Sequence, residues 1–269
     1  MTPQPDIVTP QRNSIVTPIA PNDHVLLMDD RGRKYLIRAV DRVGKVKGIG
    51  VFNPYTLVDQ HYGTTIKIGT KHFVVLHPSV VDKVEGIPRR AQIITPKDAA
   101  QIALQCDVNS GDLIVEGGMG SGALTIVLAS LVKPDGRVIS YEWRKDFARF
   151  AQQNLALASL EQWCEIKLGD ITQGIDEVGV DAVILDLPNP WDVVETSFNA
   201  LRVCGHFASY SPTIGQVEKT VAELRRRPFA EIKVLETLQR EIVVGPRGTR
   251  PSSNMLGHTG YLTFARKIL

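Results

Sequence analysis

Four acidic side chains are the best candidates for chemistry in this sequence, because each one closes or follows a short apolar segment that is typical of a buried strand. They are Glu116, Glu142, Asp170 and Asp186. In an open parallel sheet the ligand lies at the carboxyl ends of the strands, so we expect the four acids to face one cavity. Taken singly, Glu142 could be a solvated acid at a helix start, and Asp170 is about equally consistent with a turn residue. The set of four is more specific than any member.

A glycine-rich stretch follows the first of these acids. Four glycines come after Glu116, at Gly117, Gly118, Gly120 and Gly122. This order predicts a strand, a turn with positive φ angles and a helix N-terminus, whose free N–H groups suit a polar or anionic ligand. The alternate spacing differs from the GxGxxG pattern of dinucleotide-binding folds. It matches the ExGxGxG form seen in class I methyltransferases that use S-adenosylmethionine (SAM). A glycine-rich turn without a ligand is the alternative interpretation.

Two later segments complete the predicted cavity. Glu142 lies about 20 residues after the last glycine, where an acid can accept hydrogen bonds from both ribose hydroxyls of a nucleoside. Asp186 opens the segment Asp186–Trp191, which contains two prolines. Prolines stiffen the backbone, so this segment predicts a rigid wall that presents an acid and an aromatic ring to the same cavity. Trp191 alone is equally consistent with a core aromatic.

The elements that must position these residues alternate from Gly111 onward. Strands are expected at Leu113–Val115, Arg137–Tyr141, Ala182–Leu185, His206–Ser209, about Ile232–Val244 and Tyr261–Ala265. Helices are expected to begin near Gly122, Arg144, Trp191 and Ile214, and another runs from Thr95, as N-cap, to about Cys106. The alternation predicts an α/β, Rossmann-like fold with an open, mostly parallel sheet and a late antiparallel strand.

The chain before this region differs in composition. Residues 1–21 are rich in proline and predict a disordered tail, and residues 22–85 read as short alternating strands of a small β-barrel or sandwich. Residues 86–269 form the expected catalytic domain. Basic residues concentrate in the first half of the β domain and are candidates for contacts with nucleic-acid phosphates: Arg31, Arg33, Lys34, Arg38, Arg42, Lys45 and Lys47. A solvated basic face is the more common explanation of such a cluster.

The overall composition is that of an ordinary globular protein. Of the 269 residues 43% are hydrophobic and 22% are charged, with a formal net charge of +2. The three cysteines are far apart and form no CxxC pair, which disfavours a zinc site or a disulfide framework. We expect no signal peptide, and no apolar run in the sequence is long enough to span a bilayer. We therefore expect a cytoplasmic protein without a metal or a membrane contact.

From about residue 88 to its C-terminus the sequence resembles the archaeal and bacterial tRNA (adenine-N1)-methyltransferases that modify adenine 58 in the T-loop. The resemblance rests on five stretches: Ile93–Ala99, Glu116–Thr125, Val138–Glu142, Asp186–Trp191 and Gly257–Gly260. The length and the N-terminal β domain are also similar to that family. The resemblance implies a seven-stranded class I SAM-dependent fold, a homotetramer and binding of the tRNA T-loop, with adenine 57 as a further possible target.

The resemblance also implies roles for individual residues. SAM would be bound by Glu116, Gly118, Gly120, Ser121, Gly122, Ala123, Leu124, Glu142, Arg144, Phe147, Asp170 and Asp186, with Glu142 on the ribose and Asp170 beside the adenine. Asp186 is the expected catalytic residue, holding the amino group of the target adenine. The substrate would be bound by Thr95, Trp191, Arg250 and His258. Three positions depart from the family pattern, since Thr95 stands in place of an aromatic or histidine, Met119 in place of a small residue or Thr, and Asn189 in place of an acid.

Three alternatives remain open. The chain could be a SAM enzyme that acts on another atom, since Asp186–Pro190 is loosely similar to loops of exocyclic-amine methyltransferases. It could be a non-catalytic RNA-binding partner subunit, which the intact acids and glycines disfavour. A nicotinamide-dependent oxidoreductase is disfavoured by the glycine spacing.

Overall fold

The computed structural model describes residues 17–46, 48–245 and 248–269, and the chain divides into two units, Met1–Pro78 and Ser79–Leu269. Most of the expected tail, residues 1–16, lies outside the described residues. The end of the expected tail, around Ile19, is instead packed against the rest of the first unit. Ile19 is only 1% exposed, and its amide donates to the Gln60 carbonyl at 2.8 Å. Ile19 therefore belongs to the core of the first unit.

The first unit is built on an antiparallel sheet with strand order β2-β1-β6-β5. Its strands are β1 (His24–Asp29), β2 (Lys34–Arg38), β5 (Thr65–Ile68) and β6 (Lys71–Leu76), and a separate pair comprises β3 (Gly44–Val46) and β4 (Gly50–Phe52). A short 3-10 helix, η1, spans Pro54–Leu57. Alternate residues of the strands, such as Val25, Leu27, Phe73 and Val75, face one apolar core. The small β domain predicted from the sequence is thus observed.

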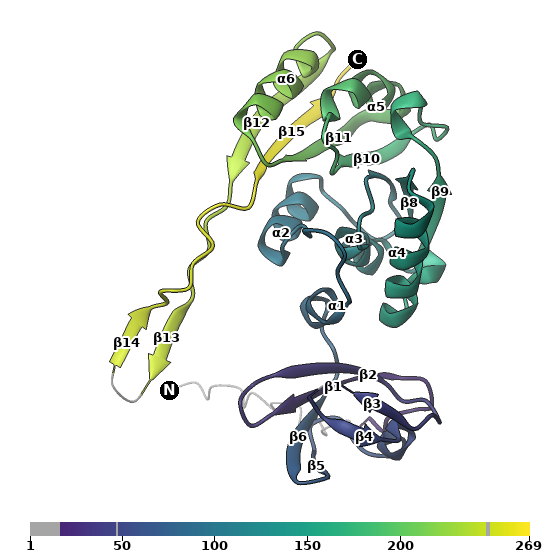
Figure 1. Ribbon diagram of the computed structural model, residues 1–269. Coiled ribbons are helices and arrows are strands. Elements are labelled where there is room, and N and C mark those ends of the chain that lie inside the picture. Colours follow the sequence, from purple (N-terminus) through teal and green to yellow (C-terminus); the bar gives the residue numbers. More distant parts are fainter. Residues whose placement is uncertain (1–16, 47, 246–247) are drawn as a thin grey trace, which may run out of the picture. The chain divides into compact units, whose positions relative to one another are not determined.

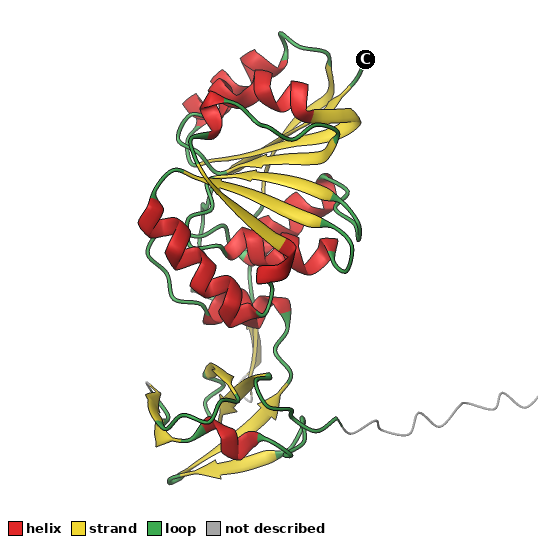
Figure 2. Ribbon diagram, turned by 90° about the vertical axis from the view of Figure 1, so that its right-hand side faces the viewer, coloured by secondary structure: helices red, strands yellow, loops and turns green. Residues whose placement is uncertain are grey.

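The second unit contains a seven-stranded sheet with strand order β12-β15-β11-β10-β7-β8-β9 (Figures 1 and 2). The strands are β7 (Leu113–Gly117), β8 (Arg137–Glu142), β9 (Cys164–Leu168), β10 (Val180–Leu185), β11 (Leu201–Ser211), β12 (Phe229–Glu236) and β15 (Tyr261–Lys267). The pairs that join β11, β10, β7, β8 and β9 are parallel, whereas β15 runs antiparallel to both of its neighbours. The predicted fold class is confirmed.

Helices cover both faces of this sheet (Figure 2). One layer comprises α1 (Val80–Gly86), α2 (Pro96–Gln105), α3 (Ala123–Val132) and α4 (Lys145–Ala158), and the other comprises α5 (Val194–Ala200) and α6 (Ile214–Leu224). Each layer buries a separate apolar cluster, because neighbouring strand residues such as Ile114 and Val115 point to opposite faces. The central strands are buried on both sides, which explains their nearly continuous apolar sequences.

One sequence expectation in this unit was wrong. The single strand expected at Ile232–Val244 is two strands, because pairing with β15 ends where β15 itself begins, opposite Glu236. The chain then leaves the sheet and forms an exposed hairpin of β13 (Ile242–Gly245) and β14 (Gly248–Pro251), which we call the arm (Figure 1). Thr95 is the N-cap residue of α2, as expected, although its hydroxyl makes no cap bond to the backbone and donates instead to the Asp98 carboxylate at 2.8 Å.

Candidate functional site

The glycine loop forms as predicted between β7 and α3. Gly118, Gly120 and Gly122 have φ angles of 86°, 54° and 81°, a region that glycine adopts more readily than other residues. A Cβ on Gly118 would also meet the Asp186 carbonyl oxygen at 2.1 Å. The loop therefore requires glycine at this position both for its backbone angle and for the close approach of the next strand end.

Two hollows open at the carboxyl ends of the strands and share Gly118 and Asp186. The larger has a volume of about 220 Å³ and is lined by Glu142, Arg144 and Asp170 among others. The smaller, of about 10 Å³, adds five further predicted residues to the shared pair: Glu116, Gly120, Ser121, Ala123 and Leu124. We refer to both together as the strand-end site. All four acids that the sequence singled out line it.

Glu142 is buried and already organised by its neighbours. Its carboxylate accepts hydrogen bonds from the Gly120 amide at 3.3 Å and from the Arg144 amide at 3.0 Å. The Arg144 guanidinium also binds it, with Nε at 3.1 Å, and lies over the ring of Phe147 at 3.6 Å. Arg144 binds the carboxylate of Glu142, and Phe147 packs against the Arg144 guanidinium. Together they hold the Glu142 side chain in one orientation.

Glu116 is 1% exposed at the end of β7. Burial raises the pKa of its carboxyl to about 7, and the nearby charges of Asp186 and Glu142 add to the rise. Hydrogen bonds from Ser140 and from Thr125, the latter at 2.7 Å, oppose it. The smaller hollow is therefore bordered by two acids with raised pKa values, Glu116 and Asp186.

Asp186 follows β10, and its backbone amide donates to the Gly117 carbonyl at 2.8 Å, which ties the strand end to the glycine loop. Burial raises the pKa of its carboxyl to about 7. Within the part of the chain that the structure describes, no hydrogen bond to this carboxylate is found. Asp186 thus presents an unengaged acceptor to both hollows.

Trp143, which lines the strand-end site, and Tyr210, which lies near it, were not predicted as functional residues. Trp143 directly follows Glu142, is 71% exposed and lines the larger hollow. Its position directly after Glu142 was the sequence feature from which Trp143 could have been predicted to line the site. Tyr210 lies near the end of β11, next to the strand that carries Asp186, and the Asp186 charge contributes to the raised pKa of its phenol. Only the order of the strands in the sheet brings Tyr210 to this place, and the sequence alone does not show that order.

The remaining predicted residues lie in different places. Asp170 is exposed at the rim of the larger hollow and accepts a hydrogen bond from the Thr172 amide at 2.9 Å. Trp191 lies in the 3-10 helix η4 (Pro190–Val193), with the Lys219 ammonium 4.6 Å from its ring centre. Arg250 lies on the exposed arm. His258 binds Glu236 at 2.7 Å and the Pro212 carbonyl at 3.0 Å, which fixes both of its ring nitrogens.

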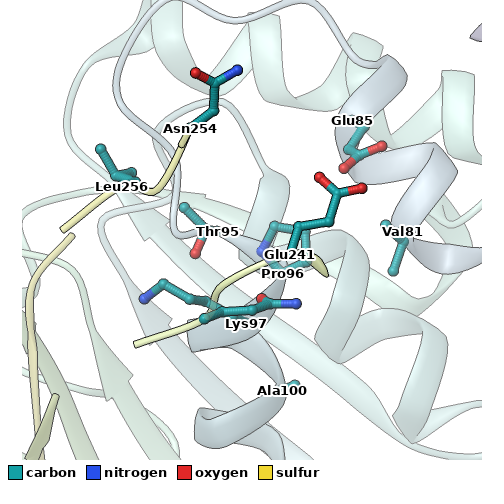
Figure 3. A pocket seen from close by; sticks show the side chains of 10 residues that line it. Val81, Glu85, Thr95, Pro96, Lys97, Ala100, Glu241, Asn254 and Leu256 are labelled. Atoms are coloured by element: carbon teal, nitrogen blue, oxygen red, sulfur yellow. The ribbon is translucent and has the colours of Figure 1, made fainter. Parts of the chain in front are cut away.

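Thr95 lines a separate and larger cavity of about 560 Å³ (Figure 3). This cavity is bounded by α1, by the start of α2 and by the two chain segments that lead into and out of the arm. Thr95 and Lys97 come from α2 or its cap, and Glu241 and Asn254 come from the arm segments. Thr95 is adjacent in sequence to Ile94, which lines the smaller hollow, so one short segment contributes to both cavities.

The described residues contain no cluster of His, Cys, Asp and Glu that could hold a metal ion. The same part of the chain contains no helix that is long and apolar enough to cross a membrane.

Comparison with known proteins identifies close relatives. Residues 72–247 match the sequence model of a family described as tRNA methyltransferase complex GCD14 subunit. The chain is 36% identical to the tRNA (adenine(57)-N(1)/adenine(58)-N(1))-methyltransferase TrmI of Methanocaldococcus jannaschii, over 90% of this chain and 94% of that protein. It is 30% identical to the tRNA (adenine(58)-N(1))-methyltransferase TrmI of Thermus thermophilus, over 90% of this chain and 96% of that protein.

Solved structures agree with these matches. A structure described as a SAM-dependent O-methyltransferase from Thermotoga maritima is 36% identical, with a TM-score of 0.84, and the match covers 93% of this chain and 95% of that one. The tRNA (m1A58) methyltransferase TrmI from Aquifex aeolicus is 27% identical, with a TM-score of 0.78 and coverage of 94% and 100%. The resemblance read from the sequence is thereby confirmed. With matches of this extent in both sequence and structure, the chain belongs to the tRNA methyltransferase family of the GCD14 subunit.

Proposed function

We propose that this chain is a SAM-dependent methyltransferase that transfers a methyl group to N1 of adenine 58 in the T-loop of tRNA. The observation that carries the proposal is the strand-end site, where an unengaged Asp186 carboxylate lies between the glycine loop and the larger hollow. The Methanocaldococcus relative is named for adenines 57 and 58, so both positions are candidate targets here.

The residues of the site fit SAM. The glycine loop leaves its backbone open to a ligand at Gly120, since nothing lies within 4 Å of an added Cβ there. Glu142 has two carboxylate oxygens held in place by Arg144, which suits a pair of ribose hydroxyls. Asp170 at the rim would accept from the adenine amine, and Ser121–Leu124 would bind the amino-acid end. SAM would supply an electrophilic methyl group on a sulfonium, which is already a good leaving group.

The chemistry asks little of the protein beyond positioning. N1 of adenine carries a free lone pair, so no strong base is needed. The target adenine must leave its stack and present N1 to the methyl group. Asp186 would accept a hydrogen bond from the adenine amino group and so orient the ring. Its carboxylate would also stabilise the positive charge that methylation places on the purine.

Thr95, Trp191, Arg250 and His258 are proposed contacts to the RNA, with different support. Trp191 follows the proline segment of Asp186, and Arg250 is exposed on the arm, where a cation could meet a phosphate. His258 already uses both ring nitrogens within the protein, which favours a supporting role over base contact. Thr95 has no aromatic ring to stack on a base. We propose further that the protein acts in the cytoplasm as a homotetramer.

The test is incubation of the purified protein with isotopically labelled SAM and tRNA, followed by nucleoside mass spectrometry. N1-methyladenosine rearranges to the N6 isomer in base, which separates the two atoms, and a methyl on the ribose oxygen leaves the base mass unchanged. T-loop variants of the tRNA that replace adenine 57 or 58 then identify the position. Label at another atom, or on a tRNA lacking both adenines, contradicts the proposal.

A further inference from the structure

One buried acid of the second unit takes no part in the proposed chemistry. Asp98, in the first turn of α2, is 0% exposed. Its carboxylate accepts three hydrogen bonds, from the Thr95 hydroxyl at 2.8 Å, the Lys97 ammonium at 2.7 Å and the Thr259 hydroxyl at 2.8 Å. Hydrogen bonds to a charged group are stronger than neutral ones, particularly where water is excluded. Asp98 therefore holds Thr259, although the two are 161 residues apart in sequence.

Thr259 in turn holds Tyr210. The Lys97 ammonium also donates to the Thr259 hydroxyl at 2.7 Å, and the Tyr210 hydroxyl donates to the Thr259 carbonyl. The ring of Tyr210 packs on Gly260, where an added Cβ would lie 2.5 Å from a ring carbon. Tyr210 is 5% exposed, so Thr259 and Gly260 contact a buried ring.

Tyr210 lies beside the strand end that carries Asp186. Strands β10 and β11 are parallel, and their pairing ends with Leu185 opposite Ser209; Asp186 and Tyr210 are the residues that directly follow these two. Burial raises the pKa of Tyr210 to about 12, and the charges of Asp186 and Asp98 contribute. The phenol thus stays protonated and remains a donor to Thr259 at neutral pH.

We infer that Asp98 is a positioning residue for the transfer reaction, because it fixes Thr259 and through it the side chain of Tyr210 beside Asp186. This inference rests on the proposed function. It gives a structural reason for two residues of the stretch Gly257–Gly260: Thr259 accepts the hydrogen bond from Tyr210, and Gly260 leaves room for the Tyr210 ring. The chain of contacts starts at Thr95 and Lys97, which line the cavity beside the arm (Figure 3), and ends at Tyr210, whose phenol is within the influence of the Asp186 charge.

The test compares Asp98→Asn and Thr259→Val with Thr259→Ser, which keeps the hydroxyl, and with the matched control Asp176→Asn, an exposed carboxylate whose side chain is 82% accessible. We expect Asp98→Asn and Thr259→Val each to lower kcat by about tenfold to a hundredfold, the scale of a small misplacement in a reacting complex. The dissociation constant of SAM should stay within about twofold. Thr259→Ser should retain most of the activity. The double variant should lose no more than the worse single variant, because both break one chain of contacts.

Hydrogen exchange gives a readout that does not depend on turnover. Asp98→Asn should speed exchange in the segment 257–262, relative to wild type and Asp176→Asn, without a global loss of protection. Unchanged kcat with unchanged exchange, additive losses in the double variant, or a parallel loss of SAM binding would each overturn the positioning role. A wild-type protein that methylates no tRNA rejects the proposed function, and the exchange measurement then decides whether Asp98 holds Thr259.

Discussion

The Asp186 carbonyl oxygen lies 2.1 Å from the place where a Cβ on Gly118 would have to sit. The two residues come from adjacent strand ends, and the bond from the Asp186 amide to the Gly117 carbonyl, at 2.8 Å, holds them together. The glycine loop and the acid are therefore parts of one rigid backbone assembly. Anything that moves the loop also moves the carboxylate that we expect to orient the target base.

Gly118→Ala should impair both folding and cofactor binding. The new methyl group would meet a backbone atom that cannot rotate away, at a φ of +86° that is strained for alanine. Strain of this kind costs about 1–3 kcal/mol before the clash is counted. We expect a lower midpoint of thermal unfolding and a loss of SAM affinity by calorimetry. Gly215→Ala is the matched control, because nothing lies within 4 Å of its added Cβ. Equal SAM affinity in the two variants would contradict the inference that the glycine loop has no room for a side chain at Gly118.

Asp186→Ala should lower turnover by about 10²–10⁴, the scale for one positioned electrostatic or proton-handling group. The reason is that its carboxylate is the unengaged acceptor shared by both hollows. Single-turnover methylation of tRNA with saturating SAM measures the effect on the chemical step. Glu195→Gln serves as a control, since this carboxylate is 64% exposed and pairs with Arg227. A variant at Asp186 with the wild-type rate would remove it from the mechanism.

Much of the site could be predicted from the sequence, because parallel strands place their carboxyl ends at one edge whatever their order. Glu116 and Glu142 lie at the ends of β7 and β8, Asp170 and Asp186 follow β9 and β10, and all four line the strand-end site. The glycine turn could also be predicted, because the preference for a positive φ depends on the type of each single residue and not on its neighbours in space.

The arm, Tyr210 and the Asp98 contacts could not be predicted in this way. The segment after Glu236 has the composition of a strand, and only the length of its partner β15 decides that it leaves the sheet. Asp98 has the sequence position of an ordinary first-turn acid, and its bond to Thr259 depends on tertiary packing. Contacts between residues far apart in sequence leave no spacing pattern from which to infer them.

Glu142→Gln should weaken SAM binding by about tenfold to a hundredfold, because it replaces a charged acceptor by a neutral amide, and hydrogen bonds to charged groups contribute about 1.5–3 kcal/mol. The Arg144 guanidinium, now bound to the carboxylate at 3.1 Å, would lose its ion pair as well. Calorimetry with SAM measures the loss. At saturating SAM the methylation rate should recover most of its wild-type value. A large fall in kcat without a change in affinity would assign Glu142 to the chemical step instead.

The strand-end acids also predict a pH dependence of the rate. Burial raises the pKa of Asp186 to about 7, and only the carboxylate form can stabilise a cationic product. Activity of the protein should therefore rise with pH through about 7 and level off above it. Initial rates between pH 5.5 and 8.5, at saturating SAM and tRNA, give the profile. In Asp186→Asn the residual activity should lose this rise, and a profile unchanged by the substitution would attribute it to another group.

Glu116 predicts a pH dependence of stability with the opposite sense. Its pKa is raised from 4.5 to about 7 in the folded protein, so the folded state holds its proton over a range in which the unfolded state has released it. Its contribution to stability is thus fully present below about 4.5 and is lost as pH rises through about 7. Chemical unfolding of wild type and Glu116→Gln at several pH values tests this, because the amide does not titrate. The free energy of unfolding of the variant, relative to wild type, should increase from pH 5 to pH 8. A difference that stays constant over this range would mean that Glu116 titrates at its ordinary pKa and is charged in the folded site.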